Sequence, residues 1–312
     1  MTELQNRLIE FFRRVPLPAT ACQFSSRYLS GACLASADKK IRSYFVIPLS
    51  KGAVLPSFYK KNIADASSLE KSLSEGMTRL KPGGKKVVFL LPELSQKVFI
   101  FNFDSMPSPP EEKEALIRFR VKKQLPLLPR DTRMAFETSP SPEGVRVVAT
   151  VAKAAVVREY EDLFHKLHYQ VALAGVPSLS LLNLLDPEKD RDFILLDVED
   201  DSFSLLAMID GQASLYRQKP FGIEAAGGGE AAAKADNVLQ EVVNTINFIW
   251  DKEKKKIASV WLRLGILQAD DSLFNRMEER LALPLRRIES AFPQELEAGN
   301  KQILSPLIGQ IS

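Results

Sequence analysis

Two short polar runs of the sequence lie at the turns of predicted strand hairpins, where a fold could hold phosphate. They are QFSSRYLS, residues 23–30, and DVEDDS, residues 197–202. A hairpin that holds phosphate needs glycine, which lets backbone N–H groups approach, and carboxylates, which hold Mg²⁺ together with water and phosphate oxygens. The first run lacks both kinds of residue. In the second run Asp197 is followed by three further acids, which would repel a triphosphate.

Other kinds of site have less support in the sequence. The net charge is only +3, and no stripe of Lys and Arg with interleaved aromatic residues occurs, so we expect no nucleic-acid binding. The run Gly227–Gly229 is not followed by Lys-Ser/Thr as in a P-loop, and we expect it to be a link between elements. His165 and His168 have no further ligands nearby in the sequence, so we expect no metal site.

The elements that must position the two polar runs occur in the same order in both halves of the chain. Hydrophobic periodicity predicts three strands, a helix and a buried strand in each half. In the first half they are strands at 20–24, 28–35 and 42–48, a helix at 68–80 and the strand KVVFLLP. In the second half they are DFILLDV, SFSLLAMI, QASLYRQK, a helix at 231–254 and IASVWLRL, followed by a helix at 272–281 and the strand LPLRRI. This order predicts an α/β (α+β) fold in which two ribonuclease-H-like lobes face each other across a cleft, which is the two-lobed actin-like architecture.

A small α+β subdomain is predicted between the two halves. Its first helix carries acidic residues near the start and basic residues near the end, so that both ends complement the helix dipole. The helix stops at LPLLP, residues 125–129, which we call the elbow. Two strands, at 132–138 and 145–151, and a further helix follow.

These patterns predict a division of the chain into four parts. They are an N-terminal amphipathic helix at 1–18, a first lobe at 19–94 and 172–188, an inserted subdomain at 95–171, and a second lobe at 189–312 whose outer part is about 220–256. The only two cysteines, Cys22 and Cys33, suit a reducing compartment. A turn at Arg27 and Tyr28 would place them opposite each other on a hairpin, as thiols.

Several segments, taken in order, resemble the PilM family, the actin-like component of type IV pilus assembly. PSPPEEKEALIRFRVKKQLPLLPRDTRMAFE is similar to the family's inserted helix, elbow and strand. FILLDVEDDSFSLLAMIDGQASLYRQKPFG is similar to its second-lobe hairpin, with Gly211, Arg217 and Gly222 as the G…R…G ending. NVLQEVVNTINFIW, WLRLGILQADDSLFNRMEERLALPLRRI and SPLIGQIS resemble the segments that follow. No single motif carries the resemblance, which rests on the order of the segments from about residue 19 onward.

The resemblance implies a partner and a place in the cell. A PilM-like protein lies in the bacterial cytoplasm at the face of the inner membrane and binds the N-terminal tail of the inner-membrane protein PilN in a groove beside the inserted subdomain. It associates with the membrane peripherally, through that partner, and links it to the motor ATPase of the pilus. The candidate partner-binding residues here are Arg118, Lys122, Leu125, Pro126, Leu127 and Leu128.

The resemblance also identifies the positions of a nucleotide site. The family's first motif is Asp-x-Gly-Ser/Thr with a Lys further on, and here Gln23, Ser25 and Ser30 replace the Asp, the Gly and the Lys. In the second motif, Asp-x-Gly, Asp197 is retained and Glu199 replaces the Gly. In the third motif, Gly-Gly, Leu264 replaces the first Gly and Gly265 is retained. Because three motifs are degraded together, we expect Mg-ATP binding to be lost or very weak. The chain is then a non-catalytic scaffold with no cofactor.

Three other functions stay open at this point. An ATPase or kinase of the actin superfamily would use Asp197 as its catalytic residue, but the phosphate loops that it needs are altered. A GspL-like protein of type II secretion would have a membrane span after this domain. An FtsA-like protein would form filaments, and surface residues alone do not decide this.

Overall fold

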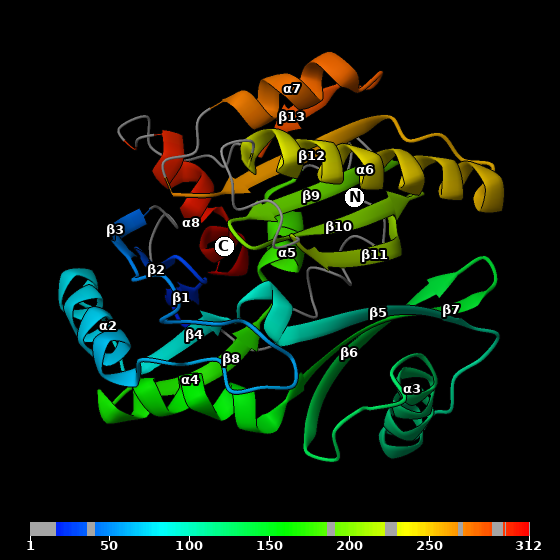
Figure 1. Ribbon diagram of the computed structural model, residues 1–312. Helices are drawn as coiled ribbons and strands as arrows, with labels where there is room; N and C mark the ends of the chain where they lie inside the picture. Colours follow the sequence, from blue (N-terminus) through cyan, green and yellow to red (C-terminus); the bar gives the residue numbers. More distant parts are fainter. Residues whose placement is uncertain are drawn as a thin grey trace.

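The protein forms two lobes with a smaller subdomain attached to the first (Figure 1). The computed structural model describes residues 17–35, 41–185, 191–221, 230–267, 271–288, 296 and 298–311. The predicted helix at 1–18 lies almost wholly outside the described residues, as do Gly222 and the glycine run at 227–229. Among the residues that the structure describes, no helix is long and apolar enough to cross a membrane.

Each lobe is built on a five-stranded mixed sheet, and the two sheets have the same topology. The first has the strand order β3-β2-β1-β4-β8 and the second the order β11-β10-β9-β12-β13. In both sheets three antiparallel strands are followed by two parallel ones. The strands of the first sheet are β1 (Thr20–Phe24), β2 (Tyr28–Leu34), β3 (Ile41–Pro48), β4 (Lys86–Leu90) and β8 (Gln170–Gly175). Those of the second are β9 (Phe193–Glu199), β10 (Ser202–Ile209), β11 (Gln212–Pro220), β12 (Ser259–Gly265) and β13 (Leu285–Arg287). The duplicated fold predicted from the sequence is confirmed.

Helices cover the outer face of each sheet with their apolar sides. On the first lobe α2 (Ala66–Leu80) and α4 (Ala154–Lys166) pack against the sheet, and on the second lobe α6 (Glu230–Glu253) and α7 (Ser272–Arg280) do so. The apolar residues of α4 lie in the core of the first lobe and not in that of the inserted subdomain. The predicted insertion at 95–171 was therefore too long at its end, because the periodicity of a helix shows that it has an apolar face but not which sheet that face covers.

The inserted subdomain has a three-stranded antiparallel sheet of order β5-β7-β6, with α3 packed on one face. Its elements are β5 (Gln96–Phe103), α3 (Pro110–Gln124), β6 (Thr132–Ser141) and β7 (Gly144–Lys153), preceded by the 3₁₀ turn η1 (Glu93–Ser95). The sequence did not predict β5, which follows directly on the buried strand β4. Alternate residues of β5 lie in two different cores, since Phe101 packs under α3 and Ile100 packs on the second lobe.

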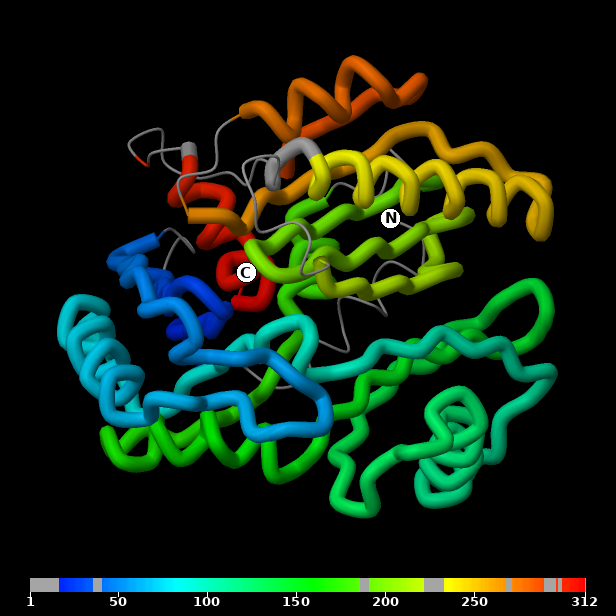
Figure 2. The backbone as a smooth tube through the Cα atoms, in the orientation of Figure 1, coloured from blue at the N-terminus to red at the C-terminus, as the bar shows by residue number. Residues whose placement is uncertain are grey.

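The two lobes exchange their last helices. After β8 the chain forms α5 (Pro177–Ser180) and η2 (Leu181–Leu184), and Leu181 packs against β9 and β10 of the second lobe. The final helix α8 (Ala298–Ile311) belongs by sequence to the second lobe, but Leu304 and Leu307 pack on β1, β2 and β4 of the first lobe. Figure 2 shows α8, in red, at the centre of the molecule between the lobes. The predicted assignment of all of 189–312 to the second lobe is wrong for this helix.

The cysteine hairpin was predicted with the wrong register. Cys22 pairs with Gly31 and Cys33 pairs with Thr20, because the turn lies one residue nearer the start of the hairpin than expected, which shifts the strand pairing by two residues. Both cysteines are buried free thiols on the same face of the sheet, as diagonal and not direct neighbours. Burial and the neighbouring Cys33 raise the pKa of the Cys22 thiol far above its ordinary value, which disfavours the nucleophilic thiolate form.

Candidate functional site

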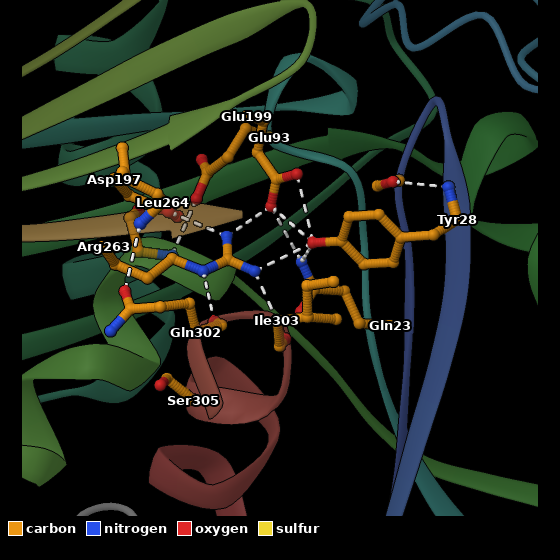
Figure 3. Close-up of polar contacts among 12 residues, drawn as sticks. Gln23, Tyr28, Glu93, Asp197, Glu199, Arg263, Leu264, Gln302, Ile303 and Ser305 are labelled. Atoms are coloured by element: carbon orange, nitrogen blue, oxygen red, sulfur yellow. Dashed lines mark hydrogen bonds and ion pairs between the residues drawn. The ribbon is translucent and has the colours of Figure 1, made fainter. Parts of the chain in front are cut away.

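A buried arginine lies where the two lobes meet. Arg263 comes from the middle of β12 and is fully buried. Its Nη1 donates to Asp197 Oδ1 at 2.8 Å and to Glu199, its Nη2 to Tyr28 Oη at 2.8 Å, and its Nε to the backbone oxygen of Gln302 at 2.8 Å (Figure 3). A buried guanidinium is stable only when its N–H donors have partners, and here each of its three nitrogens has one.

The partner that α8 gives to Arg263 has a specific origin. Pro306 lies inside α8 and has no N–H, so the carbonyl of Gln302, four residues earlier, has no helical donor. Arg263 Nε donates to that carbonyl, and Nη2 reaches the carbonyl of Ile303 at 3.3 Å. The Gln302 side chain accepts from the N–H of Leu264 at 3.1 Å and donates to the carbonyl of Ile288 at 3.1 Å. The same arginine thus holds the helix that covers the first lobe.

The contacts of Arg263 continue into the first lobe through Tyr28. The Tyr28 hydroxyl donates to Glu199 Oε1 at 2.9 Å, while it accepts from Arg263 and from Gln23 Nε2 at 3.3 Å. Gln23 Nε2 also donates to Glu199 Oε1 at 3.1 Å. We call Gln23, Tyr28, Asp197, Glu199 and Arg263 the interlobe cluster. Burial raises the pKa of Glu199 to about 8, against the lowering effect of Arg263 and with the repulsion of Asp197.

The structure brings some of the predicted cleft residues into this cluster and others not. Gln23, Asp197 and Glu199 lie in it. Ser25 instead closes the β1–β2 turn, since its Oγ accepts from the backbone N–H groups of Arg27 at 3.1 Å and Tyr28 at 2.9 Å. Ser30 is buried within β2.

The residues Leu264 and Gly265 contact the rest of the chain, Leu264 in the core of the second lobe and Gly265 beside Arg263. The side chain of Leu264 packs in the core of the second lobe, because neighbouring residues of a strand point to opposite faces. Gly265 follows in the same strand, and a Cβ atom there would clash with the guanidinium of Arg263. Glycine at this position therefore gives room to the arginine.

A second polar cluster joins the lobes beside the first. Glu93, from η1, accepts from the backbone N–H of Ser178 at 2.7 Å and from the Tyr216 hydroxyl at 2.9 Å. Gln218 of β11 donates to the Glu93 backbone oxygen and accepts from Lys97 Nζ at 2.9 Å. Burial, and then repulsion by Asp197, raise the pKa of Glu93 to about 7.

Little space is left between the two hairpin turns. The cavity there is lined by Gln23, Glu93, Glu199 and Asp201 among others, and its volume is about 10 Å³. This is roughly the room of one water molecule, whereas pockets for small molecules measure about 300–1,000 Å³. Among the described residues, no group of three or more His, Cys, Asp or Glu side chains is placed to hold a metal ion.

The candidate partner-binding residues lie together at the end of α3, but they face in two directions. Leu125 and Leu128 pack on the core of the inserted subdomain. Lys122, Pro126 and Leu127 are exposed, and Leu127 has 79% of its surface accessible. Arg118 pairs with Glu114 at 2.8 Å and donates to the backbone oxygen of Thr132 at 3.3 Å. The elbow therefore has an inner side that holds the subdomain together and an outer side that faces solvent.

The sequence reasoning missed Arg263, Tyr28 and Glu93. One signal was present for Arg263, since it is the only charged residue in the otherwise apolar run VWLRLG. Its register partner Asp197 lies in the neighbouring parallel strand. Tyr28 and Glu93 gave no comparable signal, because their partners are 171 and 123 residues away in sequence.

The comparisons with known proteins show the fold. No family model matches the sequence, and no curated protein matches it either. A chain of a PilM–PilN type IV pilus biogenesis complex is 14% identical, with a TM-score of 0.75 over 95% of this chain and 97% of that one. A Bacteroides thetaiotaomicron protein with an actin-like ATPase fold and unknown function is 10% identical, with a TM-score of 0.53 over 99% and 98%.

A further similar structure comes from a secretion system. The cytoplasmic domain of EpsL, an inner-membrane component of the type II secretion system of Vibrio cholerae, is 8% identical, with a TM-score of 0.50 over 93% of this chain and 94% of that one. These likenesses confirm the resemblance that the sequence indicated, at the level of the fold. The chain has the two-lobed actin-like fold, in the form that a chain of the PilM–PilN complex also has.

Proposed function

We propose that this protein is a non-catalytic scaffold of type IV pilus assembly that binds the cytoplasmic N-terminal tail of a PilN-like inner-membrane protein. The observation that carries the proposal is Arg263, which occupies the centre of the cleft with partners from both lobes. A nucleotide could enter only if the interlobe cluster were broken, and that would leave Asp197 and Glu199 buried without their cation. The fold shared with a chain of the PilM–PilN complex supports the choice of partner.

In this proposal the protein lies in the bacterial cytoplasm at the inner-membrane face, held there through its partner. The tail binds at the seam between the first lobe and the inserted subdomain. Phe58 of the first lobe packs into the same core as Leu125 and Leu128 of the inserted subdomain, so residues of both parts meet at this seam. Leu55 and Tyr59, on the same segment of the chain as Phe58, are exposed, at 57% and 43%. An exposed leucine and tyrosine on a fixed segment are suited to hold apolar residues of a peptide.

The first test concerns the cleft. We expect millimolar Mg-ATP to leave the thermal midpoint of unfolding unchanged, because Arg263 and its partners occupy the cleft. A ligand that bound, at about 100 times its Kd, would stabilise the folded chain by roughly 2.7 kcal/mol and raise the midpoint. A clear upward shift would return the ATPase or kinase function to first place. An actin-superfamily kinase known to bind ATP serves as the positive control.

The second test concerns the tail. Labelled peptides from the N-termini of PilN-like proteins and of inner-membrane proteins of a type II secretion system are titrated with the full chain, and fluorescence anisotropy is measured. We expect the PilN-like peptide to bind and the double variant Leu55→Asp, Tyr59→Ala to weaken it by at least about tenfold. Tyr44→Ala, at an exposed tyrosine of β3, is the matched control and should leave binding unchanged. Binding of neither peptide would contradict the proposed function.

The similarity to EpsL supports one second candidate, a role in type II secretion. The two candidates share the scaffold chemistry and differ in the partner. Preference of the chain for the secretion-type peptide over the pilus-type peptide in the same titration would favour this second role. A link to the motor ATPase of the pilus is a further part of the first proposal, and co-purification of the two proteins would test it.

A further inference from the structure

The outer side of the elbow includes Lys122, Pro126 and Leu127, which the resemblance gave as candidate partner-binding residues. Neither the cleft nor the tail-binding surface proposed at Leu55 and Tyr59 uses it. Leu127 is 79% exposed and Phe119, on the last turns of α3, is 55% exposed. Phe119, Lys122 and Lys123 have the spacing i, i+3 and i+4, which places them on one face at the end of the helix, and Pro126 follows just beyond that end. That face points away from Ile117 and Val121, which are buried in the subdomain core.

The shape of the elbow is fixed and convex. The N–H of Leu128 donates to the backbone oxygen of Leu125 at 3.0 Å, so residues 125–128 form a turn with Pro126 at its second position, where proline favours the turn. Leu127 is at the tip. Leu125 and Leu128 hold the two ends of the turn in the core. Figure 1 shows α3 at the outer edge of the molecule. The exposed leucine is thus presented in advance, with little conformational entropy left to lose on binding.

Most of the charge around this apolar tip is positive, although the exposed Asp131 follows Arg130. Residues 118–130 contain five basic residues and no acidic one, namely Arg118, Arg120, Lys122, Lys123 and Arg130. Of these, Arg118 is paired with Glu114 and Arg120 lies over the rings of Phe101 and Phe103. Lys123 lies over the exposed ring of Phe119, 4.7 Å from its centre. The acids of α3 lie at its other end. Glu112 and Lys123 are eleven residues apart, about 16 Å along a helix, beyond the Debye length of about 8 Å at physiological salt.

We propose that the outer side of the elbow binds the surface of an anionic lipid bilayer, with Leu127 and Phe119 entering the headgroup layer and Lys122 and Lys123 contacting lipid phosphates. An exposed apolar tip inside a ring of basic side chains matches such a surface both in polarity and in charge. A peptide would need a concave site for its side chains, whereas Leu127 lies at the exposed tip of a turn. This inference goes beyond the proposed scaffold role, because it gives the protein a lipid contact of its own.

The test measures binding of the full chain to vesicles by co-sedimentation. One set is phosphatidylcholine alone, and the other is phosphatidylcholine and phosphatidylglycerol in equal parts. We expect binding to the anionic vesicles only, and weaker binding as salt is added. Each lysine near an anionic surface contributes about fivefold in partitioning, so the variant Lys122→Glu, Lys123→Glu should lose at least about 25-fold. Leu127→Asp should lose roughly tenfold.

Matched variants on α6 and on the residues just after it distinguish this site from an effect of general charge. Lys252→Glu, Lys256→Glu makes the same charge change at exposed lysines of the second lobe, and Val243→Asp makes the same kind of apolar-to-acid change at an exposed residue. Both should bind vesicles like the original chain. Equal losses in the α6 and elbow variants would overturn the proposal, as would equal binding to neutral and anionic vesicles, or no binding.

The peptide titration is run on the same variants. Retained tail binding by the elbow variants, together with lost vesicle binding, is the expected result. Loss of tail binding by Leu127→Asp with no binding of the original chain to vesicles would mean that this surface serves the partner protein and would overturn the lipid assignment. Failure of the tail to bind any variant would count against the proposed function alone, since the vesicle result does not depend on it.

Discussion

The interlobe cluster and the elbow both contain basic side chains, but they differ in whether these side chains are buried among partners or face solvent. In the cluster, Arg263 is fully buried and finds its partners inside the chain, from β9, β2 and α8. At the elbow, Lys122 and Leu127 face solvent. The cluster can therefore be complete without a ligand, while the elbow is a surface on which a ligand can still be gained. In the proposed scaffold the cluster between the lobes has a structural role, and the inserted subdomain offers the free surfaces.

Removing the buried cation should have the largest effect on stability. Arg263→Met leaves Asp197 and Glu199 buried without a cation, and we expect the free energy of unfolding to fall by about 3–5 kcal/mol. Urea unfolding measures this change in the free energy of unfolding. Arg79→Met, which breaks the exposed pair with Glu75, is the control and should cost about 0–1 kcal/mol.

A compensated variant sharpens this prediction. Adding Asp197→Asn and Glu199→Gln to Arg263→Met removes the buried negative charges, and much of the lost stability should return. If the triple variant is no more stable than Arg263→Met, the loss comes from packing and the charge argument fails.

The second cluster predicts a dependence of stability on pH. Glu93 has its pKa raised to about 7 in the folded chain, against 4.5 as its ordinary value. The folded state therefore binds a proton that the unfolded state releases, so this contribution is fully present below the ordinary pKa and is lost as the pH rises through about 7. The shift corresponds to at most about 3 kcal/mol between the two limits.

Glu93→Gln should remove this part of the pH dependence. Urea unfolding at several values between about pH 5 and pH 8 compares the variant with the original chain. The original chain should lose stability relative to Glu93→Gln as the pH rises. Parallel curves for the two proteins would show that Glu93 does not titrate in this range.

The close contact at Gly265 predicts a somewhat smaller effect. Gly265→Ala places a Cβ atom against the guanidinium of Arg263, which its partners hold in place. We expect a loss of about 1–3 kcal/mol, as for other overpacked sites. Gly83→Ala is a useful control, since a Cβ atom there meets nothing within 4 Å. In a chain that already carries Arg263→Met, Gly265→Ala should lower the free energy of unfolding by much less. An unchanged loss would mean that the new Cβ atom does not clash with Arg263.

The elbow should give the smallest effect on stability. Leu127→Asp changes a side chain that is 79% exposed, so we expect the free energy of unfolding to change by no more than about 0.5 kcal/mol. Leu128→Asp, one residue later, puts a charge against the core of the inserted subdomain and should be strongly destabilising. Similar losses for the two variants would mean that the elbow has no free outer side.

Much of the architecture follows from the sequence alone. Alternating and continuous apolar runs determine the strands. Helical periodicity determines which sides of α2 and α6 are buried, because each element must bury one side. The order of these elements, repeated in the two halves, was enough to predict two lobes of the same topology. The sequence shows which residues stand at the positions that the resemblance assigns to a nucleotide site, such as Gln23, Ser25 and Glu199, but not which contacts they make.

Only the tertiary structure decides how the parts combine. That α4 covers the first lobe and that α8 crosses over to it cannot be read from periodicity, which gives an apolar face but no partner. The cluster around Arg263 joins residues up to 235 positions apart, and side chains so distant meet only once both lobes have folded. The two directions of Leu127 and Leu128 are likewise set by the turn and the core beneath it, since the two residues have the same chemistry and differ only in what the fold places beside them.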